Sequence, residues 1–374
     1  MSEIKVNSIK GVAASSAAIT VNNTDGTCTA NITNKPNRNL IINGAMQVAQ
    51  RGTSSTSSGY QTLDRFPVYL NGCDENPTIS QADIASGTTP YTLGFRKSLK
   101  ITNGNQTSGA GSNDYIWIQN KIEAQDIANS GWNYKSSSSF ITLSFWVKSS
   151  VAQTFKGYIE TMDGTAYQYP FETGSLSADT WTKITKSIPG NSNLQFDNNN
   201  AEGFKISIIP MMGTDKTASS VTEDAWSAYS SSARIKDVTT TWYTTNDATL
   251  EITGVQLEVG SVATDFEHRS FGQELALCQR YYEELHPRLF VLARYSHHDG
   301  NPYTQYHFKV EKRAAPTCTS SGTFQTSTGY SGAPSFSDTL KDSTDIYGAN
   351  SVTAGGILYL HNNSNGICHF SAEL

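Results

Sequence analysis

Short runs in which apolar and polar residues alternate constrain the fold of this chain more than any other feature of its sequence. In ITLSFWVKS, apolar residues occupy every second position from Ile141 to Val147. Side chains of a β-strand point alternately to its two faces, so this run predicts a strand with one buried face. The runs YIWIQNKI, FKGYIE, FKISII and TLEITGVQLEV predict further strands.

In the last of these runs the alternation slips by one residue. Its apolar residues move from Leu250 and Ile252 to Val255 and Leu257, and Gly254 lies at the change. An extra residue in one strand produces a β-bulge, and glycine tolerates the backbone angles that a bulge requires. We therefore predict a β-bulge at Gly254.

Residues 39–268 are predicted to form a jelly-roll β-sandwich. All six tryptophans lie between Trp117 and Trp242, which indicates a large middle domain with its own core. Many short strands with turn residues about every 8–15 positions are typical of two packed sheets. Charged residues make up only 16% of the chain, against about 25% in average proteins. Serine, threonine, asparagine and glycine take their place and favour strands and turns.

Composition also excludes several classes of protein. The net charge is −6 and lysine and arginine do not cluster, which argues against nucleic-acid binding. No run of about 18 apolar residues is present, so we expect no membrane insertion. The N-terminus lacks the apolar core of a signal peptide, so we expect synthesis and folding in the cytoplasm. The five cysteines are widely spaced without a zinc pattern, and we interpret them as reduced, mostly buried thiols.

Residues 1–38 are predicted to form a separate N-terminal hairpin segment. The stretch AITVNNTDGTCTANI resembles two strands joined by a turn at Asp25-Gly26, with Ile19, Val21 and Ile32 as its main apolar residues. Such a hairpin is marginally stable alone. It therefore needs to pack on identical copies or on a docking protein, and a disordered arm is the alternative.

Residues 269–286 contain the one convincing helix. Ser270 and Gln273 form a capping box before FGQELALCQRYYEEL, and Pro287 ends the run. The spacing of the apolar residues predicts a stripe that either forms a seam between neighbouring chains or packs on the chain's own domain. The stripe consists of Leu275, Cys278, Tyr282 and Leu285.

Residues 287–374 return to strands in LFVLARYS, TQYHFKV, GGILYLHN and GICHFSAEL, and predict a small C-terminal β-sandwich. The predicted fold class is therefore all-β. Its parts are an N-terminal hairpin segment, a jelly-roll β-sandwich, one short helix and a small C-terminal β-sandwich tip.

Motifs for catalysis are absent from the sequence. There is no GxSxG, GxxxxGK[ST], HExxH or complete GxGxxG motif. The carboxylate pairs Glu160 with Asp163 and Glu223 with Asp224 can be proposed for glycan hydrolysis, but acidic residues in polar loops are usually only solvated. We therefore predict no enzyme, no catalytic residue and no cofactor.

Aromatic residues in polar surroundings give the better signal for binding. Flat aromatic rings suit the apolar face of a sugar, and neighbouring polar side chains can bond its hydroxyls. The alternative is that these rings fill the core. The candidate ligand-binding residues in the middle domain are Trp132, Tyr134, Trp226 and Trp242.

Three segments resemble tail-fibre and related host-recognition proteins of tailed bacteriophages, especially those of marine phages. They are NRNLIINGAMQVAQRGTS with YQTLDRF, then ITGVQLEVGSVATDFEHRSFGQELALCQRYYE, and the ending FSAEL. FKVEKRAAPT extends the resemblance towards the C-terminus, and SFWVKSS looks like the central strand of carbohydrate-binding modules. The resemblance implies a jelly roll like those modules. Some of them hold a structural calcium, for which Asn43 and Glu258 are candidates here, and we leave metal unassigned.

The resemblance also implies a homotrimer that is fixed to other virion tail proteins by its N-terminus and faces the host with its C-terminal tip. If the strand at 288–295 runs outward, the loop from Ser296 to Tyr303 is distal. His297 and His298 can also seed a metal site, although an exposed polar loop tip is the simpler interpretation. The candidate tip residues are His297, His298, Asp299 and Tyr303.

The leading hypothesis is a homotrimeric tail fibre of the virion that attaches to bacterial surface polysaccharide. Three weak sites on one trimer would gain avidity. The first alternative is a purely structural virion decoration without receptor binding. The second is a glycan depolymerase.

Overall fold

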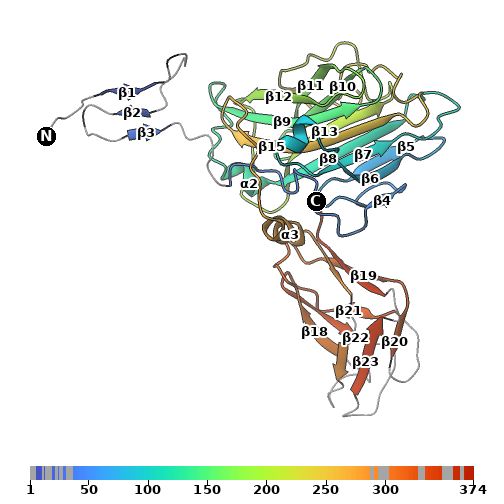
Figure 1. Ribbon diagram of the computed structural model, residues 1–374. Helices are drawn as coiled ribbons and strands as arrows, with labels where there is room; N and C mark the ends of the chain where they lie inside the picture. Colours follow the sequence, from blue (N-terminus) through green and yellow to red (C-terminus); the bar gives the residue numbers. More distant parts are fainter. Residues whose placement is uncertain are drawn as a thin grey trace.

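The computed structural model describes residues 6–10, 12, 19–21, 24, 28–30, 37–286, 290–293, 303–326, 333–347, 357–362 and 366–374. Strands dominate these residues, and all strand pairs are antiparallel. The fold is all-β, as predicted. A jelly-roll body forms the larger part, and a smaller C-terminal domain lies beside it (Figure 1).

The body consists of two six-stranded sheets. Sheet I has the order β14 (Ser227–Ala228), β11 (Tyr167–Ser175), β10 (Thr154–Thr161), β13 (Glu202–Met212), β8 (Tyr115–Glu123), β5 (Val68–Asn71). Sheet II has the order β12 (Thr182–Pro189), β9 (Phe140–Ser149), β15 (Thr249–Val259), β7 (Lys97–Thr102), β6 (Thr78–Asp83), β4 (Ser54–Ser55). Two short helices, α1 (Thr89–Thr92) and α2 (Ala124–Ala128), lie in the connections.

The core of the body lies between the two sheets. Every apolar residue predicted for the inner face of β9, from Ile141 to Val147, is fully buried. These side chains belong to one cluster with Ile118, Ile159 and Ile206 from sheet I. Burial of each such side chain stabilises the fold by about 1.5–3 kcal/mol. The alternating pattern therefore predicted the strand and its inward face correctly.

The β-bulge predicted at Gly254 is present. The register between β15 and β9 shifts between Thr253 and Gln256, and Gly254 has a φ of 63°. A β-carbon at Gly254 would lie 2.7 Å from the ring of Phe95. Glycine is therefore required both by the backbone angle and by the close approach of this ring.

The predicted helix is present but shorter than expected. α3 spans Phe271–Gln279, and the capping box of Ser270 and Gln273 is formed. The chain then turns and continues as β16 (Tyr282–Leu285). The prediction that the helix reaches residue 286 is therefore wrong, because pairing of β16 with β24 satisfies the backbone of this segment instead.

The predicted four-residue seam is not a face of one helix. Leu275 and Cys278 lie on α3, whereas Tyr282 and Leu285 lie on β16. Cys278 is 1% exposed and Tyr282 is 4% exposed, so both pack inside their own chain. The seam prediction is wrong in this form, and the homotrimer itself stays a prediction.

The C-terminal domain begins at β16, five residues earlier than predicted, and has two sheets. One has the order β16, β24 (Ile367–Ser371), β19 (Thr317–Ser321). The other has the order β20 (Phe324–Thr326), β23 (Ile357–Asn362), β17 (Phe290–Ala293), β18 (Tyr303–His307), β22 (Ser343–Tyr347), β21 (Ser335–Ser337). Its core contains Phe308, Phe324, Ile346, Cys368 and Phe370.

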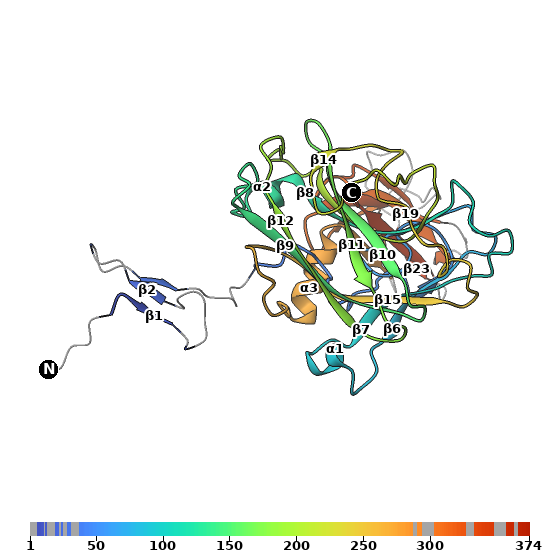
Figure 2. The same cartoon turned by 90° about the horizontal axis from the view of Figure 1, so that it is seen from above.

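The N-terminal segment forms a small sheet of its own, which we call the arm. β2 (Ile19–Val21) pairs with β3 (Cys28–Ala30) as predicted, and β1 (Ser8–Ile9) adds a strand that was not predicted. The turn predicted at Asp25-Gly26, and Ile32, lie outside the described residues. The arm lies to one side of the body (Figure 2). Within its described residues, Val6, Ile9 and Val12 are exposed.

The described cysteine thiols Cys73, Cys278, Cys318 and Cys368 are free, as predicted. Among the helices that the structure describes, none has the length and hydrophobicity needed to cross a membrane.

Candidate functional site

The outer face of sheet I carries an unusual set of large polar and aromatic side chains. Alternation places them on the side opposite the core, and the register aligns them in rows across three strands. One row pairs Tyr158 with Ser207 and Ser207 with Gln119, and the next pairs Glu160 with Lys205 and Lys205 with Lys121. The set comprises Trp117, Gln119 and Lys121 on β8, Lys156, Tyr158 and Glu160 on β10, and Lys205, Ser207 and Ile209 on β13.

Trp117 is the aromatic centre of this outer face. Its indole is half-buried, and its ring centroid lies 5.9 Å from that of Tyr158 and 6.0 Å from that of Tyr115. The guanidinium of Arg234 lies 5.0 Å from the same ring, and the Lys205 ammonium lies 5.9 Å from it. The electron-rich face of tryptophan attracts cations at these distances.

Arg234 lies on the segment between β14 and β15. Ile235 is fully buried against Tyr158 and Ile209, which anchors the segment on the outer face. The Gln168 side chain donates to the carbonyl of Ala233 at 2.8 Å, and Arg234 Nε donates to the Tyr229 hydroxyl at 2.8 Å. The position of Arg234 is therefore set by apolar packing and by hydrogen bonds on both sides.

Two buried polar atoms beside Trp117 have no hydrogen-bond partner among the described residues. They are Trp117 Nε1 and Arg234 Nη1. The hydroxyls of Tyr158 and Ser207 are also buried and can bond each other across β10 and β13. A buried polar group left without a partner costs about 1–3 kcal/mol. Such groups are uncommon, so we expect ordered water or a ligand to complete the hydrogen bonding of the half-buried Trp117 and Arg234.

The hydroxyl of Tyr158 keeps its proton under ordinary conditions. Burial raises the pKa of Tyr158 well above its usual value, and the negative charge of Glu160 acts in the same direction. Tyr158 can therefore donate a hydrogen bond as well as accept one.

The lysines of this outer face are paired with carboxylates. Lys205 contacts Glu160 at 2.7 Å, and Lys121 contacts Glu202 at 3.1 Å. Lys156 contacts Glu172 at 2.5 Å and Glu223 at 2.7 Å. Burial lowers the pKa of Lys156, but hydrogen bonds to these two carboxylates outweigh it and raise the pKa.

The carboxylate pairs considered for hydrolysis are occupied by other contacts. Glu160 and Glu223 each bind a lysine, and Asp224 contacts Lys186 at 3.0 Å. Asp163 accepts from the backbone of Asp197 at 3.0 Å. This arrangement favours stacking and hydrogen bonding over general acid–base chemistry.

Two of the four aromatic candidates are core residues. Trp132 is 3% exposed and Trp242 is 0% exposed. Their indole nitrogens donate to the carbonyls of Ser139 at 3.3 Å and Thr249 at 3.0 Å. Neither ring has a face free for a ligand, so the prediction that they bind one is wrong. Their polar neighbours in the sequence belong to loops that cover these large apolar rings. Burial of the rings stabilises the body.

The other candidates are half-buried or lie outside the described residues. Tyr134 and Trp226 are half-buried and pack on the body core, and Trp226 donates to the Pro189 carbonyl at 2.7 Å. Tyr303 is half-buried on β18, opposite Ala293 of β17. β17 and β18 are therefore antiparallel neighbours. His297, His298 and Asp299 lie outside the described residues, and their role as a tip site stays a prediction.

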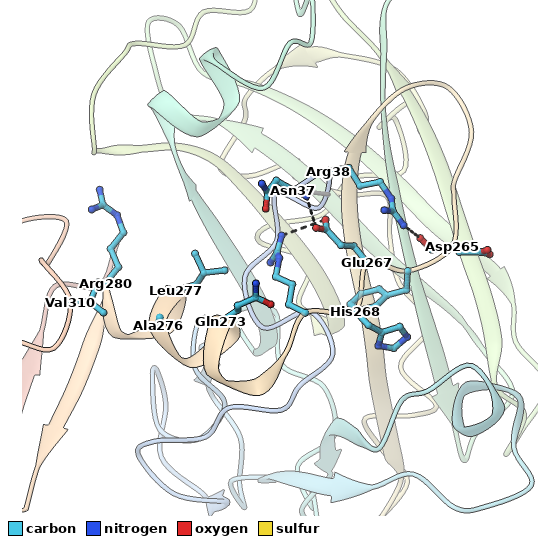
Figure 3. A pocket seen from close by; sticks show the side chains of 12 residues that line it. Asn37, Arg38, Asp265, Glu267, His268, Gln273, Ala276, Leu277, Arg280 and Val310 are labelled. Carbon is cyan, nitrogen blue, oxygen red and sulfur yellow. Dashed lines mark hydrogen bonds and ion pairs between the residues drawn. The ribbon is translucent and has the colours of Figure 1, made fainter. Parts of the chain in front are cut away.

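A pocket of about 770 Å³ lies where the arm enters the body (Figure 3). It is bordered by Asn37 and Arg38, by residues 265–269, by α3 and by Val310. Its arginines already have partners: Arg38 contacts Glu258 at 3.5 Å, and Arg280 binds Glu123. Leu277 and Ala276 leave the α3 side apolar. The pocket therefore offers little charge to an ionic ligand.

Asn43 and Glu258 do not fit the calcium role that the resemblance implies. The Asn43 side chain is buried. It exchanges hydrogen bonds with the backbone of Val48 and also donates one to the Asp64 carbonyl. Glu258 accepts two hydrogen bonds from Thr264 at 2.8 and 2.6 Å. Both side chains fasten loops instead of converging on an ion. No cluster of three metal-ligating side chains occurs in the described part of the chain.

The residues around Trp117 were not identified from the sequence. A signal was nevertheless present, because YIWIQNKI, FKGYIE and FKISII place bulky and charged side chains on the face opposite the core. A strand face that meets only water rarely contains buried tryptophan, tyrosine and lysine. Recognising the site required knowing that these three strands are neighbours.

No protein-family model matches the chain, and no curated protein sequence matches it. Among solved structures, the enzymatically active domain of tailspike protein 4 from bacteriophage CBA120 is 12% identical, with a TM-score of 0.33. The match covers 61% of this chain and only 24% of the tailspike chain, so this protein spans about a quarter of that length.

Carbohydrate-binding modules are also similar in structure. The cellulose-binding domain of Cellulomonas fimi β-1,4-glucanase C is 10% identical over 58% of this chain and 99% of its own, with a TM-score of 0.28. The family 11 carbohydrate-binding module of Clostridium thermocellum, in complex with a β-1,3-1,4-mixed-linked tetrasaccharide, is 9% identical over 58% of this chain and 98% of its own, with a TM-score of 0.25. These similarities concern the fold alone.

Proposed function

We propose that this chain is a non-enzymatic glycan-binding protein whose body holds a saccharide on the outer face of sheet I. The observation that carries the proposal is the half-buried ring of Trp117 beside the guanidinium of Arg234, whose Nη1 has no acceptor among the described residues. A sugar presents an apolar ring face for stacking and hydroxyls that both donate and accept. A sugar therefore supplies both a stacking partner for Trp117 and hydrogen-bonding groups for Arg234.

Each residue has a distinct task in this proposal. Trp117 stacks on the sugar ring, and the buried Tyr158, whose ring centroid lies 5.9 Å from that of Trp117, supports its position. Arg234 lies over the Trp117 ring, where a sugar would stack. We expect its guanidinium to move aside and donate to the bound saccharide.

We further propose that the chain is a homotrimeric tail-fibre protein that attaches a virion to bacterial surface polysaccharide. The support for this is the resemblance of three sequence segments to phage host-recognition proteins. The arm would attach to other tail proteins and to its own copies, since its exposed apolar residues need a partner. Three weak sites in one trimer would act with avidity.

The test is binding of the full chain to a panel of bacterial surface polysaccharides of known composition, measured by calorimetry. Trp117→Ala should weaken binding by about tenfold or more, the usual effect of removing a central aromatic contact. Trp146→Ala is the matched control, because Trp146 is half-buried on the outer face of sheet II.

Three results would contradict the proposal. Failure of every polysaccharide and of host cells to bind would favour a purely structural role. Loss of binding in Trp146→Ala alone would place the site on the other sheet. Release of reducing ends from a bound polysaccharide would make the chain a depolymerase.

A further inference from the structure

We infer that the saccharide bound on the outer face of sheet I is acidic, and that Arg234 binds its carboxylate. This inference rests on the proposed glycan binding and names the chemical class of the ligand. It comes from how charge is distributed around Trp117.

Among the described residues, three lysines on this outer face are neutralised, whereas Arg234 and Lys216 are not. Lys121, Lys156 and Lys205 each contact a carboxylate within 3.1 Å. Arg234 forms no ion pair with any carboxylate in the part of the chain that the structure describes, and its Nη1 has no acceptor there. The only hydrogen bond from its guanidinium goes, within the same described part, to the neutral hydroxyl of Tyr229. Lys216, whose ammonium lies 5.4 Å from the Tyr115 ring, also forms no ion pair in that part and bonds only the neutral amide of Asn113. Uncompensated positive charge therefore remains beside Trp117.

The position of Arg234 suits a ligand contact better than a structural role. Its guanidinium lies 5.0 Å from the Trp117 ring, so an anion bound to it is held next to the stacking surface. The segment that carries it is anchored by Ile235, which is fully buried, and by Gln168. A guanidinium binds a carboxylate through two parallel hydrogen bonds, and partial burial strengthens this contact.

The residues beneath Arg234 support the site but do not meet the ligand. Tyr158 and Ser207 are fully buried and lie directly opposite each other on β10 and β13. The half-buried Trp117 and Arg234 offer the ligand a stacking face and a guanidinium. A uronic acid carries a sugar ring for Trp117 and a carboxylate for Arg234. A neutral hexose stacks on the ring but leaves Arg234 without an anion.

The experiment compares each polysaccharide that binds the full chain before and after its carboxylates are chemically reduced to primary alcohols. We expect reduction to weaken binding by about tenfold. Arg234→Gln should weaken binding of the intact acidic polymer to a similar extent, and should weaken binding of the reduced polymer much less. Arg234→Lys keeps the charge without the two-pronged geometry and should give an intermediate value.

Arg96→Gln is the matched control. Arg96 also lies over an aromatic ring, with its guanidinium 3.9 Å from that of Tyr91, but on a different part of the body. It should bind the acidic polymer as the unmodified chain does, and circular dichroism should show that all variants are folded.

The outcomes separate this inference from the proposed function. Equal binding of intact and reduced polymers, with loss in Trp117→Ala, would overturn the acidic ligand and keep glycan binding. Binding only to neutral polysaccharides would do the same. Absence of binding to any polysaccharide would overturn both.

Discussion

Glu123 shows what a single residue contributes at the junction of the body and the C-terminal domain. Its carboxylate is fully buried and accepts two hydrogen bonds from Arg280, each at 2.8 Å. It also accepts from the Tyr281 hydroxyl at 2.7 Å and from Gln125 at 2.6 Å. Burial by itself raises the pKa of Glu123, but these hydrogen bonds outweigh it and hold the pKa below its usual value of 4.5.

Glu123→Gln should destabilise the protein by about 2–4 kcal/mol at neutral pH, because Arg280 then loses its buried partner. Since the folded pKa is lowered, the charge of Glu123 stabilises the fold fully above pH 4.5. This contribution is lost as the pH falls through the folded pKa. Urea denaturation of both proteins from pH 7 downward should therefore show a difference that shrinks in acid. A difference that stays constant with pH would contradict this account.

At the scale of the element, local sequence decides where structure begins, and tertiary contacts decide where it ends. The capping box of Ser270 starts α3 as predicted because both of its hydrogen bonds are local. Nothing local stops the helix after Gln279. It stops because Tyr281 inserts into the body with 1% exposure and β16 pairs with β24. Tyr281 bonds Glu123, 158 positions away, and β16 pairs with a strand about ninety positions away, which no helical pattern can reveal.

Gly254→Ala tests the β-bulge of β15. The substitution places a β-carbon 2.7 Å from Phe95 and forces a φ of 63° on alanine. We expect a loss of about 2–4 kcal/mol from strain and overpacking together, seen as a lower midpoint in urea. Gly272→Ala is the control, since it lies in α3 with no atom within 4 Å of the added carbon. It should be neutral or stabilise by up to about 1 kcal/mol.

At the scale of the whole molecule, polar contacts fasten the C-terminal domain to the body. Arg313 donates to the carbonyls of Ala372 at 2.6 Å and Glu373 at 2.9 Å, and to that of Asn200 in the body at 2.9 Å. Arg65 is buried in the body and pairs with Glu373. These bonds make the two domains support each other, so we expect them to unfold together.

Arg313→Ala should uncouple the two domains. It removes three charge-assisted hydrogen bonds and should lower stability by about 2–3 kcal/mol. In scanning calorimetry, the single transition of the unmodified chain should become two. Lys341→Ala, an exposed position of the same domain, should leave the transition as it was. A single sharp transition in both variants would show that these bonds do not couple the domains.

Alternation alone determined the all-β class, the inward face of β9, the bulge at Gly254 and the strands of the C-terminal domain. These features follow from the two-residue period of a strand, which the order of apolar and polar residues shows directly. The start of α3 and the β2–β3 hairpin were also predictable, because caps and turns involve neighbouring residues.

Only the tertiary structure decided which aromatic rings are available to a ligand. Trp117 stands between two isoleucines and Trp242 in a polar stretch, yet Trp117 lies half-buried on the outer face of sheet I and Trp242 is enclosed in the core. The partners of Trp117 come from β10, β13 and the segment of Arg234, up to about 120 positions away. The pairing of these strands is set by packing of the whole body. For that physical reason the fold, and not the local sequence, brings the residues of the candidate site together.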